Sequence, residues 1–233
     1  MISILMPIYN GIEFINESVP SIINQTFNEW ELIIGINGHP INSEVYNIAK
    51  KYEEIDDIRI KVLELFPIKG KANTLNEMIK YCKYNYVALL DVDDIWQSKK
   101  LEIQSKFINN YDVIGSNCVW FGDREGVVPR IPNYDFSDFN FAQVNPIINS
   151  SSIIKKELCF WNENGIEDYD LWLRLRKLNK KFYNCPEILV KHRIHQTSAF
   201  NSKGNNDKVK PLLHSHGYYE QQKINMKLFY TFF

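Results

Sequence analysis

The sequence predicts an α/β fold built on a mostly parallel sheet with helices on both faces. Two observations lead to this class. Short apolar runs of strand length alternate with segments whose apolar residues recur at helical spacing, giving the order β-α-β-α-β-α-β through residues 2–90. Helical crossovers of this kind join parallel strands, and strands that helices cover on both faces are apolar without alternation.

The first elements follow at the very start of the chain. Residues 2–6 are a compact apolar run that Pro7 stops, so we expect a strand buried on both faces. Residues 12–25 carry isoleucine and valine at helical spacing and predict a helix. A second buried strand is expected over residues 31–36, ended by the Asn-Gly-His-Pro turn of residues 37–40.

The alternation continues along the chain. Residues 43–54 predict a second helix, and residues 58–65 predict a strand with alternating apolar side chains. Residues 71–83 predict a third helix, and the apolar residues 86–90 a fourth strand. Because each strand is followed by a helix, we expect all four strands to be parallel.

The second half is less regular. We expect a helix over residues 98–109 and a strand over residues 112–121. Residues 122–145 are rich in Pro, Gly, Asp and Asn, which is typical of long loops. Leucines at helical spacing predict a helix over residues 167–180, and residues 187–192 predict a further strand.

The C-terminal stretch carries weaker signals. Residues 200–207 are polar and rich in Gly and Asn, which predicts a loop. Residues 212–233 begin like a helix and end in an aromatic cluster. No internal repeat or low-complexity linker divides the chain, so we expect a single domain over residues 1–233.

Composition and charge narrow the functional classes. Of the 233 residues, 45% are hydrophobic and 24% are charged, the balance of a globular protein with a sizeable core. The formal net charge of -1 and the scattered basic residues give no field that attracts nucleic acid. The four cysteines form no Cys-x-x-Cys pair, and no basic leader or span of ~18 apolar residues occurs. We therefore expect reduced thiols and a cytoplasmic protein.

Polar side chains follow three of the expected strands. These are Tyr9 and Asn10 after the first, Asn37 after the second, and Asp91-Val92-Asp93-Asp94 after the fourth. Ligands of open α/β sheets bind at these carboxyl ends. Asp91 and Asp93 point to the same side of an extended segment, and two carboxylates suit Mg²⁺ or Mn²⁺ shared with substrate phosphates. Alternatively such acids only form a turn or cap a helix, a role that Asp94 fits.

Five sequence elements, in order and at matching spacing, resemble family 2 glycosyltransferases of the GT-A fold. They are Ile2–Gly11 with Ser21–Phe27, Gly70–Asn76, Ala88–Trp96, Glu167–Arg174 and Arg193–His195. The resemblance implies transfer of a sugar from a nucleoside-diphosphate donor to an acceptor hydroxyl, with inversion and a Mn²⁺ or Mg²⁺ cofactor. It also implies a glycan, lipid-linked or protein acceptor. Residues 1–110 would then bind the nucleotide sugar, and residues 111–200 the acceptor and the catalytic base.

The resemblance implies a role for each matching position. The donor-binding residues it implies are Pro7, Tyr9, Asn37, Lys71, Asp91 and Val92. Among them Pro7 and Tyr9 would line the base pocket, and Lys71 would lie near the diphosphate. Asp93 would bind the metal, together with Asp91 and His195.

The acceptor side is implied to contain Glu167 and Asp168, with Asp168 as the general base. An acceptor hydroxyl is a weak nucleophile that needs such a base. Asp168 lies where a helix is expected to begin, and the helix dipole favours its ionised form. The alternative is that Glu167, Asp168 and Asp170 are first-turn acids that only stabilise the helix.

Other histidines besides His195 are possible metal ligands. His192 lies three residues before His195 and is the other candidate. His214 and His216 form a His-x-His pair, but no acidic partner lies nearby in the sequence, so we expect surface residues. The aromatic residues of the tail 201–233 are expected to serve packing, an oligomer interface or peripheral membrane contact.

Asn37 departs from the family pattern, because many relatives carry an acid there that would accept a hydrogen bond from uracil. An amide oxygen can also accept that bond. UDP is therefore the first expectation for the donor nucleotide, and other nucleotides stay open.

Two other functions compete with a glycosyltransferase. A nucleotidyltransferase predicts a glycine-rich basic loop after the first strand, where this chain has Tyr9-Asn10-Gly11. A sugar-nucleotide-binding protein without turnover would not need Asp91, Asp93 and Asp168 together.

Overall fold

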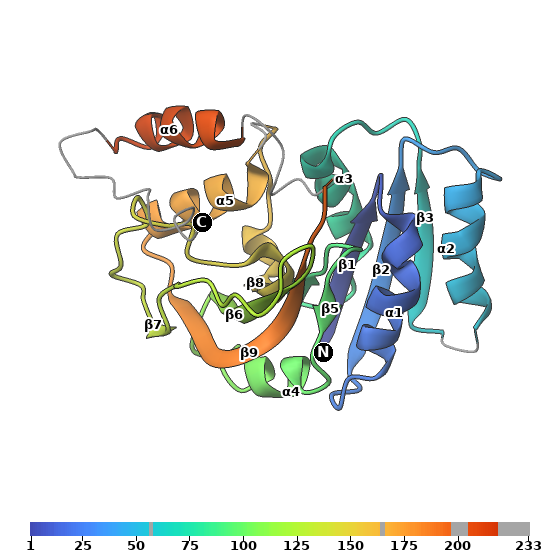
Figure 1. The fold of residues 1–233 in the computed structure, drawn as a ribbon, viewed down its shortest axis with the longest axis horizontal. Coiled ribbons are helices and arrows are strands. Elements are labelled where there is room, and N and C mark those ends of the chain that lie inside the picture. The colour runs from blue at the N-terminus through green and yellow to red at the C-terminus, as the bar shows by residue number, and fades with distance from the viewer. Residues whose placement is uncertain (56–57, 164–165, 197–204, 219–233) are drawn as a thin grey trace.

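The strands form one continuous hydrogen-bonded sheet, which has two parts. A computed structural model describes residues 1–55, 58–163, 166–196 and 205–218 (Figure 1). Its strand order is β3-β2-β1-β4-β8-β6-β9-β5, and β7 pairs with β9 outside this path. The strands are β1 (Ile2–Ile8), β2 (Trp30–Asn37), β3 (Ile60–Leu65), β4 (Tyr86–Leu89), β5 (Ile95–Trp96), β6 (Val113–Gly122), β7 (Tyr134–Asp135), β8 (Ile153–Lys155) and β9 (Phe182–Ile194).

The four N-terminal strands are parallel, as the sequence predicted. β1 pairs with β2 and β4, and β2 pairs with β3. The second part is mixed, because β8 runs antiparallel between β4 and β6 while β6 and β9 run parallel. Figure 1 shows β9 as a long curved ribbon that sweeps from the second part towards the first.

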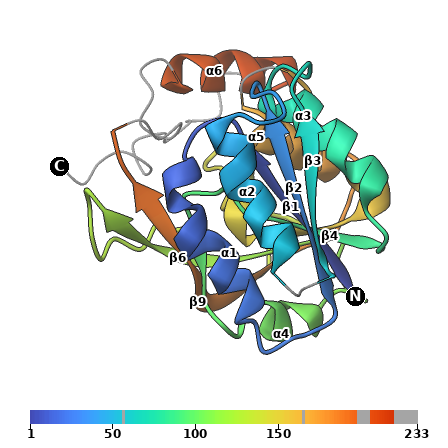
Figure 2. The same ribbon diagram turned by 90° about the vertical axis from the view of Figure 1, so that its right-hand side faces the viewer.

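Helices cover both faces of the sheet, which confirms the predicted fold class. The helices are α1 (Ile15–Ile23), α2 (Glu44–Glu54), α3 (Lys71–Met78), α4 (Lys100–Ser105), α5 (Glu167–Lys177) and α6 (Asn205–Ser215). One core cluster packs α1, α2 and α4 against alternate residues of β1, such as Ile4 and Met6. The other packs α3, α5 and α6 against the opposite side, where Leu5 lies. Figure 2 shows α1 and α2 together on one face of the sheet.

Two expected elements of the second half have different bounds. The strand expected over residues 187–192 is the end of β9, which starts at Phe182. Register shifts against β6 between Ser116 and Cys118 interrupt its pairing, and the exposed residues 187–188 interrupt its apolar pattern. The helix expected over residues 98–109 is the short α4, after which the chain continues as turns. Three strands were not expected from the sequence, β5, β7 and β8, because three residues or fewer are too short to show a periodic pattern.

The C-terminal prediction needs correction where the structure describes it. α6 begins at Asn205, inside the segment that was expected to be a loop, and ends at Ser215. Leu212 and Leu213 are buried in the second core cluster, so burial of these leucines fixes a helix in a polar stretch. Residues 219–233, with the aromatic cluster expected at an interface, lie outside the described residues. Within the described part of the chain, no helix is long and apolar enough to cross a membrane.

Candidate functional site

The polar residues that follow β1, β2 and β4 gather at the carboxyl edge of the parallel strands. Ile8 of β1 pairs with Ile36 of β2, so Tyr9 and Asn37 follow at the same level of the sheet. After β4 the chain turns at once, and the Asp94 amide donates to the Asp91 carbonyl at 3.0 Å. The structure therefore brings the predicted donor-side residues to one edge.

Tyr9 and the turn after β2 form an exposed aromatic corner. Tyr9 is 58% exposed, whereas Asn37 is buried and Pro7 is partly buried in β1. His39 contacts the Tyr9 carbonyl through Nε2 at 2.6 Å, and the two rings are 5.7 Å apart. Gly38 has φ +77°, and a Cβ there would lie 2.4 Å from the Tyr9 ring. Gly38 is thus required both by its backbone conformation and by the close approach of Tyr9.

Lys71 links the two halves of the site. It is the first residue of α3, and its Nζ lies 2.6 Å from Asp91 Oδ1 and 3.7 Å from Glu167 Oε1. Burial alone would lower the pKa of Lys71, but the carboxylates of Asp91 and Glu167 outweigh burial and raise it. Lys71 is therefore a fixed cation between the predicted donor side and the predicted acceptor side.

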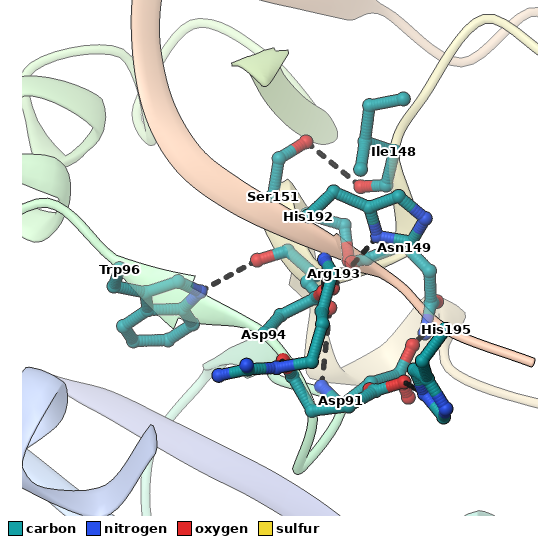
Figure 3. A network of polar contacts seen from close by, with 12 residues as sticks. Asp91, Asp94, Trp96, Ile148, Asn149, Ser151, His192, Arg193 and His195 are labelled. Carbon is teal, nitrogen blue, oxygen red and sulfur yellow. Dashed lines mark hydrogen bonds and ion pairs between the residues drawn. The ribbon is translucent and has the colours of Figure 1, made fainter. Parts of the chain in front are cut away.

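Asp91 is held from three directions. Asn149 Nδ2 donates to Asp91 Oδ2 at 3.0 Å, opposite the Lys71 contact on Oδ1. The Asp91 amide donates to Ser150 Oγ at 3.1 Å (Figure 3). Burial opposes ionisation of Asp91, but Lys71 and Asn149 stabilise the carboxylate and lower its pKa.

Asp93 and His195 form the second carboxylate contact. The His195 Nε2 atom lies 3.0 Å from Asp93 Oδ2, and its ring packs 5.2 Å from Phe14. Burial raises the pKa of Asp93, and the neighbouring carboxylates of Asp94 and Asp91 raise it further. The excess of negative charge at this turn suits a cation.

Asp94 and His192 form a separate, more buried pair. Asp94 is 1% exposed and accepts from the Arg193 amide at 2.8 Å, and its Oδ2 lies 3.1 Å from His192 Nδ1. Burial opposes the charge of His192, but Asp94 outweighs it and raises the pKa of His192 to about 9. Asp94 thus closes a turn, as expected, but its side chain ties β9 to that turn instead of capping a helix. The geometry brings His195, and not His192, to Asp93.

The side chains around Asp93 fit a divalent cation whose ligands come partly from the protein and partly from a bound substrate. Within the described residues, no group of three or more His, Cys, Asp or Glu side chains could hold a metal ion. Mg²⁺ typically takes one or two carboxylates and completes its shell with substrate phosphates and water. Asp93 with His195, beside Asp91, matches that incomplete set.

Asp168 lies in the first turn of α5, next to Glu167, which Lys71 contacts. Asn145 Nδ2 donates to Asp168 Oδ2 at 3.2 Å. Burial raises the pKa of Asp168 to about 6, and the adjacent Glu167 adds to the rise, whereas Lys71, the Tyr169 amide and Asn145 oppose it. A carboxylate with such a pKa is ionised at neutral pH and basic enough to accept a proton.

The three acids of this turn have different surroundings. Glu167 faces Lys71, as described above. Asp170 faces away from Asp168 and accepts from Arg174 Nε at 2.8 Å and from Asn162 at 2.8 Å. His216 Nε2 lies 2.9 Å from Asp170 Oδ1, so the expectation of a surface residue without an acidic partner is wrong for His216. The partner comes from α5, 46 positions away in the sequence.

Some residues that shape the site were not predicted from the sequence. Asn145, Asn149 and Ser150 lie in the irregular segment before β8, where no periodic signal distinguishes one polar residue from another. Arg193 lay in a matching motif without an assigned role. Its guanidinium stacks 4.4 Å from the Phe14 ring and 4.3 Å from the Phe121 ring, and its Nε donates to the Asp93 carbonyl at 2.8 Å.

Comparison with known proteins places this site in a sequence family. The sequence model of the family described as "Glycosyl transferase family 2" matches residues 3–195. WfgD of Escherichia coli, named UDP-Glc:alpha-D-GlcNAc-diphosphoundecaprenol beta-1,3-glucosyltransferase, is 30% identical over 215 residues, or 87% of this chain and 81% of WfgD. The putative teichuronic acid biosynthesis glycosyltransferase TuaG of Bacillus subtilis is 34% identical over 217 residues, or 87% of this chain and 82% of TuaG.

Solved structures show the same arrangement of elements. TarS 1-349 of S. aureus in complex with UDP-GlcNAc superposes with a TM-score of 0.74 at 16% identity, covering 92% of this chain. This chain spans 65% of that TarS structure, just under two thirds of its length. The mannosyltransferase PcManGT from Pyrobaculum calidifontis, in complex with GDP-Man and Mn2+, has a TM-score of 0.66 at 15% identity, covering 93% of this chain and 69% of PcManGT. At these identities the likeness establishes a common fold.

Proposed function

Because this chain belongs to glycosyl transferase family 2 and has the GT-A fold, we propose that it moves a sugar from a nucleoside diphosphate to an acceptor hydroxyl with inversion. The observation that carries this proposal is the arrangement of carboxylates around one lysine. Lys71 contacts Asp91 at 2.6 Å and also contacts Glu167, the residue before Asp168, at 3.7 Å. A donor site and a base site therefore adjoin at one fixed cation.

Donor binding is assigned to the carboxyl edge of the parallel strands. The exposed Tyr9 ring offers a stacking surface for a nucleotide base, and Pro7, Asn37 and Val92 lie in the same or adjoining segments. Lys71 offers a cation for the diphosphate. UDP is our first choice of nucleotide, supported by WfgD, whose name specifies UDP-Glc, and by the UDP-GlcNAc complex of TarS.

Asp93, His195 and Asp91 would hold a divalent cation together with the donor diphosphate. Such a cation neutralises the charge that develops on the leaving diphosphate. The PcManGT complex, which contains both GDP-Man and Mn2+, supports the choice of metal.

Asp168 is proposed as the general base. Its carboxylate takes the proton of the acceptor hydroxyl while the hydroxyl oxygen bonds to the anomeric carbon. The bond from that carbon to the diphosphate oxygen breaks, and its electron pair leaves with the nucleoside diphosphate. Because attack and departure occur on opposite faces in one step, the anomeric configuration inverts.

The acceptor is proposed to be a lipid-linked glycan handled at the cytoplasmic membrane surface. Support comes from WfgD, whose named acceptor is a GlcNAc-diphosphoundecaprenol. The segment before β8, with Asn145, would line the acceptor side because it contacts Asp168 directly.

A donor screen tests the proposal. UDP-glucose, UDP-galactose, UDP-GlcNAc and GDP-mannose are each incubated with the protein and Mn²⁺, and thermal stability and nucleotide release are measured. We expect at least one donor to raise the melting temperature by mass action and to be turned over. A donor that binds without any turnover, with or without a GlcNAc-diphosphate-alkyl acceptor, would indicate a binding protein, and binding of none would refute the proposal. Pyrophosphate release from a nucleoside triphosphate would indicate a nucleotidyltransferase.

A further inference from the structure

One loop contacts carboxylates on both sides of the site. We call residues 145–151 the bridging loop. At its start, Asn145 Nδ2 donates to Asp168 Oδ2 at 3.2 Å. Four residues later, Asn149 Nδ2 donates to Asp91 Oδ2 at 3.0 Å, and Ser150 Oγ accepts from the Asp91 amide at 3.1 Å. The base and the donor-side carboxylate are therefore both hydrogen-bonded to one short segment.

The bridging loop is itself fixed by buried contacts. The Trp96 indole donates to the Ser150 carbonyl at 2.7 Å, and Gln104 Nε2 donates to the Ser151 carbonyl at 2.8 Å. Ser151 Oγ donates to the Ile148 carbonyl at 2.8 Å and accepts from the amide of Ser116. Figure 3 shows the Trp96 indole directed towards this segment and the Ser151 hydroxyl directed towards Ile148 within it. Ser150 and Ser151 are each 1% exposed or less, so burial restricts movement of the loop.

The environment of Asp168 gives Asn145 a specific effect. Glu167 and Lys71 are the charged groups that act on the Asp168 carboxylate, with opposite signs. The Tyr169 amide and Asn145 are its hydrogen-bond donors. The Tyr169 donor is backbone on the same helix, so among the described residues Asn145 is the hydrogen-bond donor that reaches the carboxylate from a different element. An amide N–H can only donate, and it therefore stabilises the ionised carboxylate and restricts its rotation.

The other end of the Asn145 amide is unused. Its Oδ1 atom is buried and has no hydrogen-bond partner within the described residues. A buried amide that served only the loop would normally have both ends bonded, because an unpaired buried acceptor costs free energy. Here the bonded end is the one that faces Asp168.

We propose that Asn145 is a positioning residue for the base Asp168, and that the bridging loop sets the placement of the base relative to the donor-side Asp91. This inference rests on the proposed role of Asp168 as the base. Asn145 orients the carboxylate for the acceptor proton and touches no reacting atom itself. Asn149 orients the Asp91 carboxylate in the same way, through its hydrogen bond to Oδ2.

The direct test is the titration of Asp168 itself, which needs neither donor nor acceptor. Protein labelled with ¹³C at aspartate carboxyl carbons is titrated by NMR, and the Asp168 signal is identified by its loss in Asp168→Asn. We expect Asn145→Ala to move the midpoint upward by about one pH unit, the effect of losing one hydrogen bond to a charged group. Asn145→Asp, which keeps the side-chain volume, should move it further by adding a like charge. Gln143→Ala, an exposed neighbour in the same segment, should leave it unchanged.

Nucleotide release from the donor found in the screen gives the second readout. Above the titration range, Asn145→Ala should lower kcat about tenfold through misorientation of the base, with the KM for donor unchanged. Unchanged midpoints in both Asn145 variants would overturn this inference, even with Asp168→Asn inactive. If Asp168→Asn turned over at the wild-type rate, Asp168 would not be the base. The positioning role of Asn145, which rests on that base, would then be wrong as well.

Discussion

Replacing Asp168 by asparagine is expected to stabilise the fold while slowing transfer at least about a hundredfold. Burial and Glu167 raise the pKa of Asp168 to about 6, from an ordinary value of 3.8. A rise of about two units corresponds to about 3 kcal/mol against the ionised form. Because the side chain is only half-buried, screening by solvent reduces this to about 1–2 kcal/mol. Asparagine has no charge to bury, and its Oδ1 can still accept from Asn145.

The pH dependence of that gain has a definite sign. The folded-state pKa of Asp168 lies above the unfolded value, so the folded protein binds more protons between pH 4 and 6. The penalty on the wild type is therefore absent below about pH 4 and complete above about pH 6. Urea unfolding should show Asp168→Asn more stable by about 1–2 kcal/mol at pH 8, with the gap closing as the pH falls through 6.

Asp170→Asn is the matched control, two positions along the same helix. Burial disfavours the Asp170 carboxylate, but Arg174, His216 and Asn162 outweigh burial and lower its pKa. Its stabilisation is present above the ordinary carboxyl pKa and is lost as the pH falls through the lowered value. Asp170→Asn should therefore destabilise the protein at pH 8, by about 3 kcal/mol for a broken buried pair. If Asp168→Asn were equally or less stable than wild type at pH 8, the charge of the Asp168 carboxylate would not destabilise the folded protein.

Four further predictions concern donor binding and turnover. The rate of transfer should fall as the pH drops through about 6, where Asp168 becomes protonated, and a flat profile between pH 5 and 8 would exclude Asp168 as the base. Lys71→Met should weaken UDP binding by calorimetry about 10- to 100-fold, whereas Lys80→Met, which removes an exposed surface ion pair, should not. Gly38→Ala should lower the free energy of unfolding by about 1–3 kcal/mol and weaken donor binding, since the residue has φ +77° and faces the tyrosine ring. Chelation by EDTA should stop nucleotide release, and added Mn²⁺ should restore it. Asp93→Asn should need a higher Mn²⁺ concentration for the same rate, and full activity in EDTA would contradict the metal assignment.

The position of the proposed donor-side residues at the strand ends could be predicted from the sequence because its signals are local. Apolar runs fix where β1 and β4 end, and parallel strands bring these ends to one edge of the sheet. The extended segment expected for Asp91 to Asp93 is instead a turn, closed by the Asp94 amide on the Asp91 carbonyl at 3.0 Å, so the two-residue periodicity does not apply there. The first-turn position of Asp168 followed from the leucine spacing of α5. These features depend on patterns within about ten residues of each side chain.

The rest of the site depends on contacts that no local pattern encodes. Asn145 reaches Asp168 across 23 positions, and Asn149 reaches Asp91 across 58. Both asparagines lie in a stretch whose composition indicates only loops. His216 likewise looked like a surface residue until α6 packed against α5. Such long-range contacts depend on burial and tertiary packing, which cannot be read from a single sequence.

In the proposed reaction, Asp168 activates an acceptor hydroxyl for a single displacement at the donor sugar. The most direct test follows the turned-over α-linked donor by ¹H NMR, with water or the GlcNAc-diphosphate-alkyl compound as acceptor, in wild type and Asp168→Asn. We expect the β-anomer as the first product of the wild type, and we expect Asp168→Asn to form product at least about a hundredfold more slowly. An α-anomer as the first product, or equal rates in the two proteins, would contradict the proposed reaction.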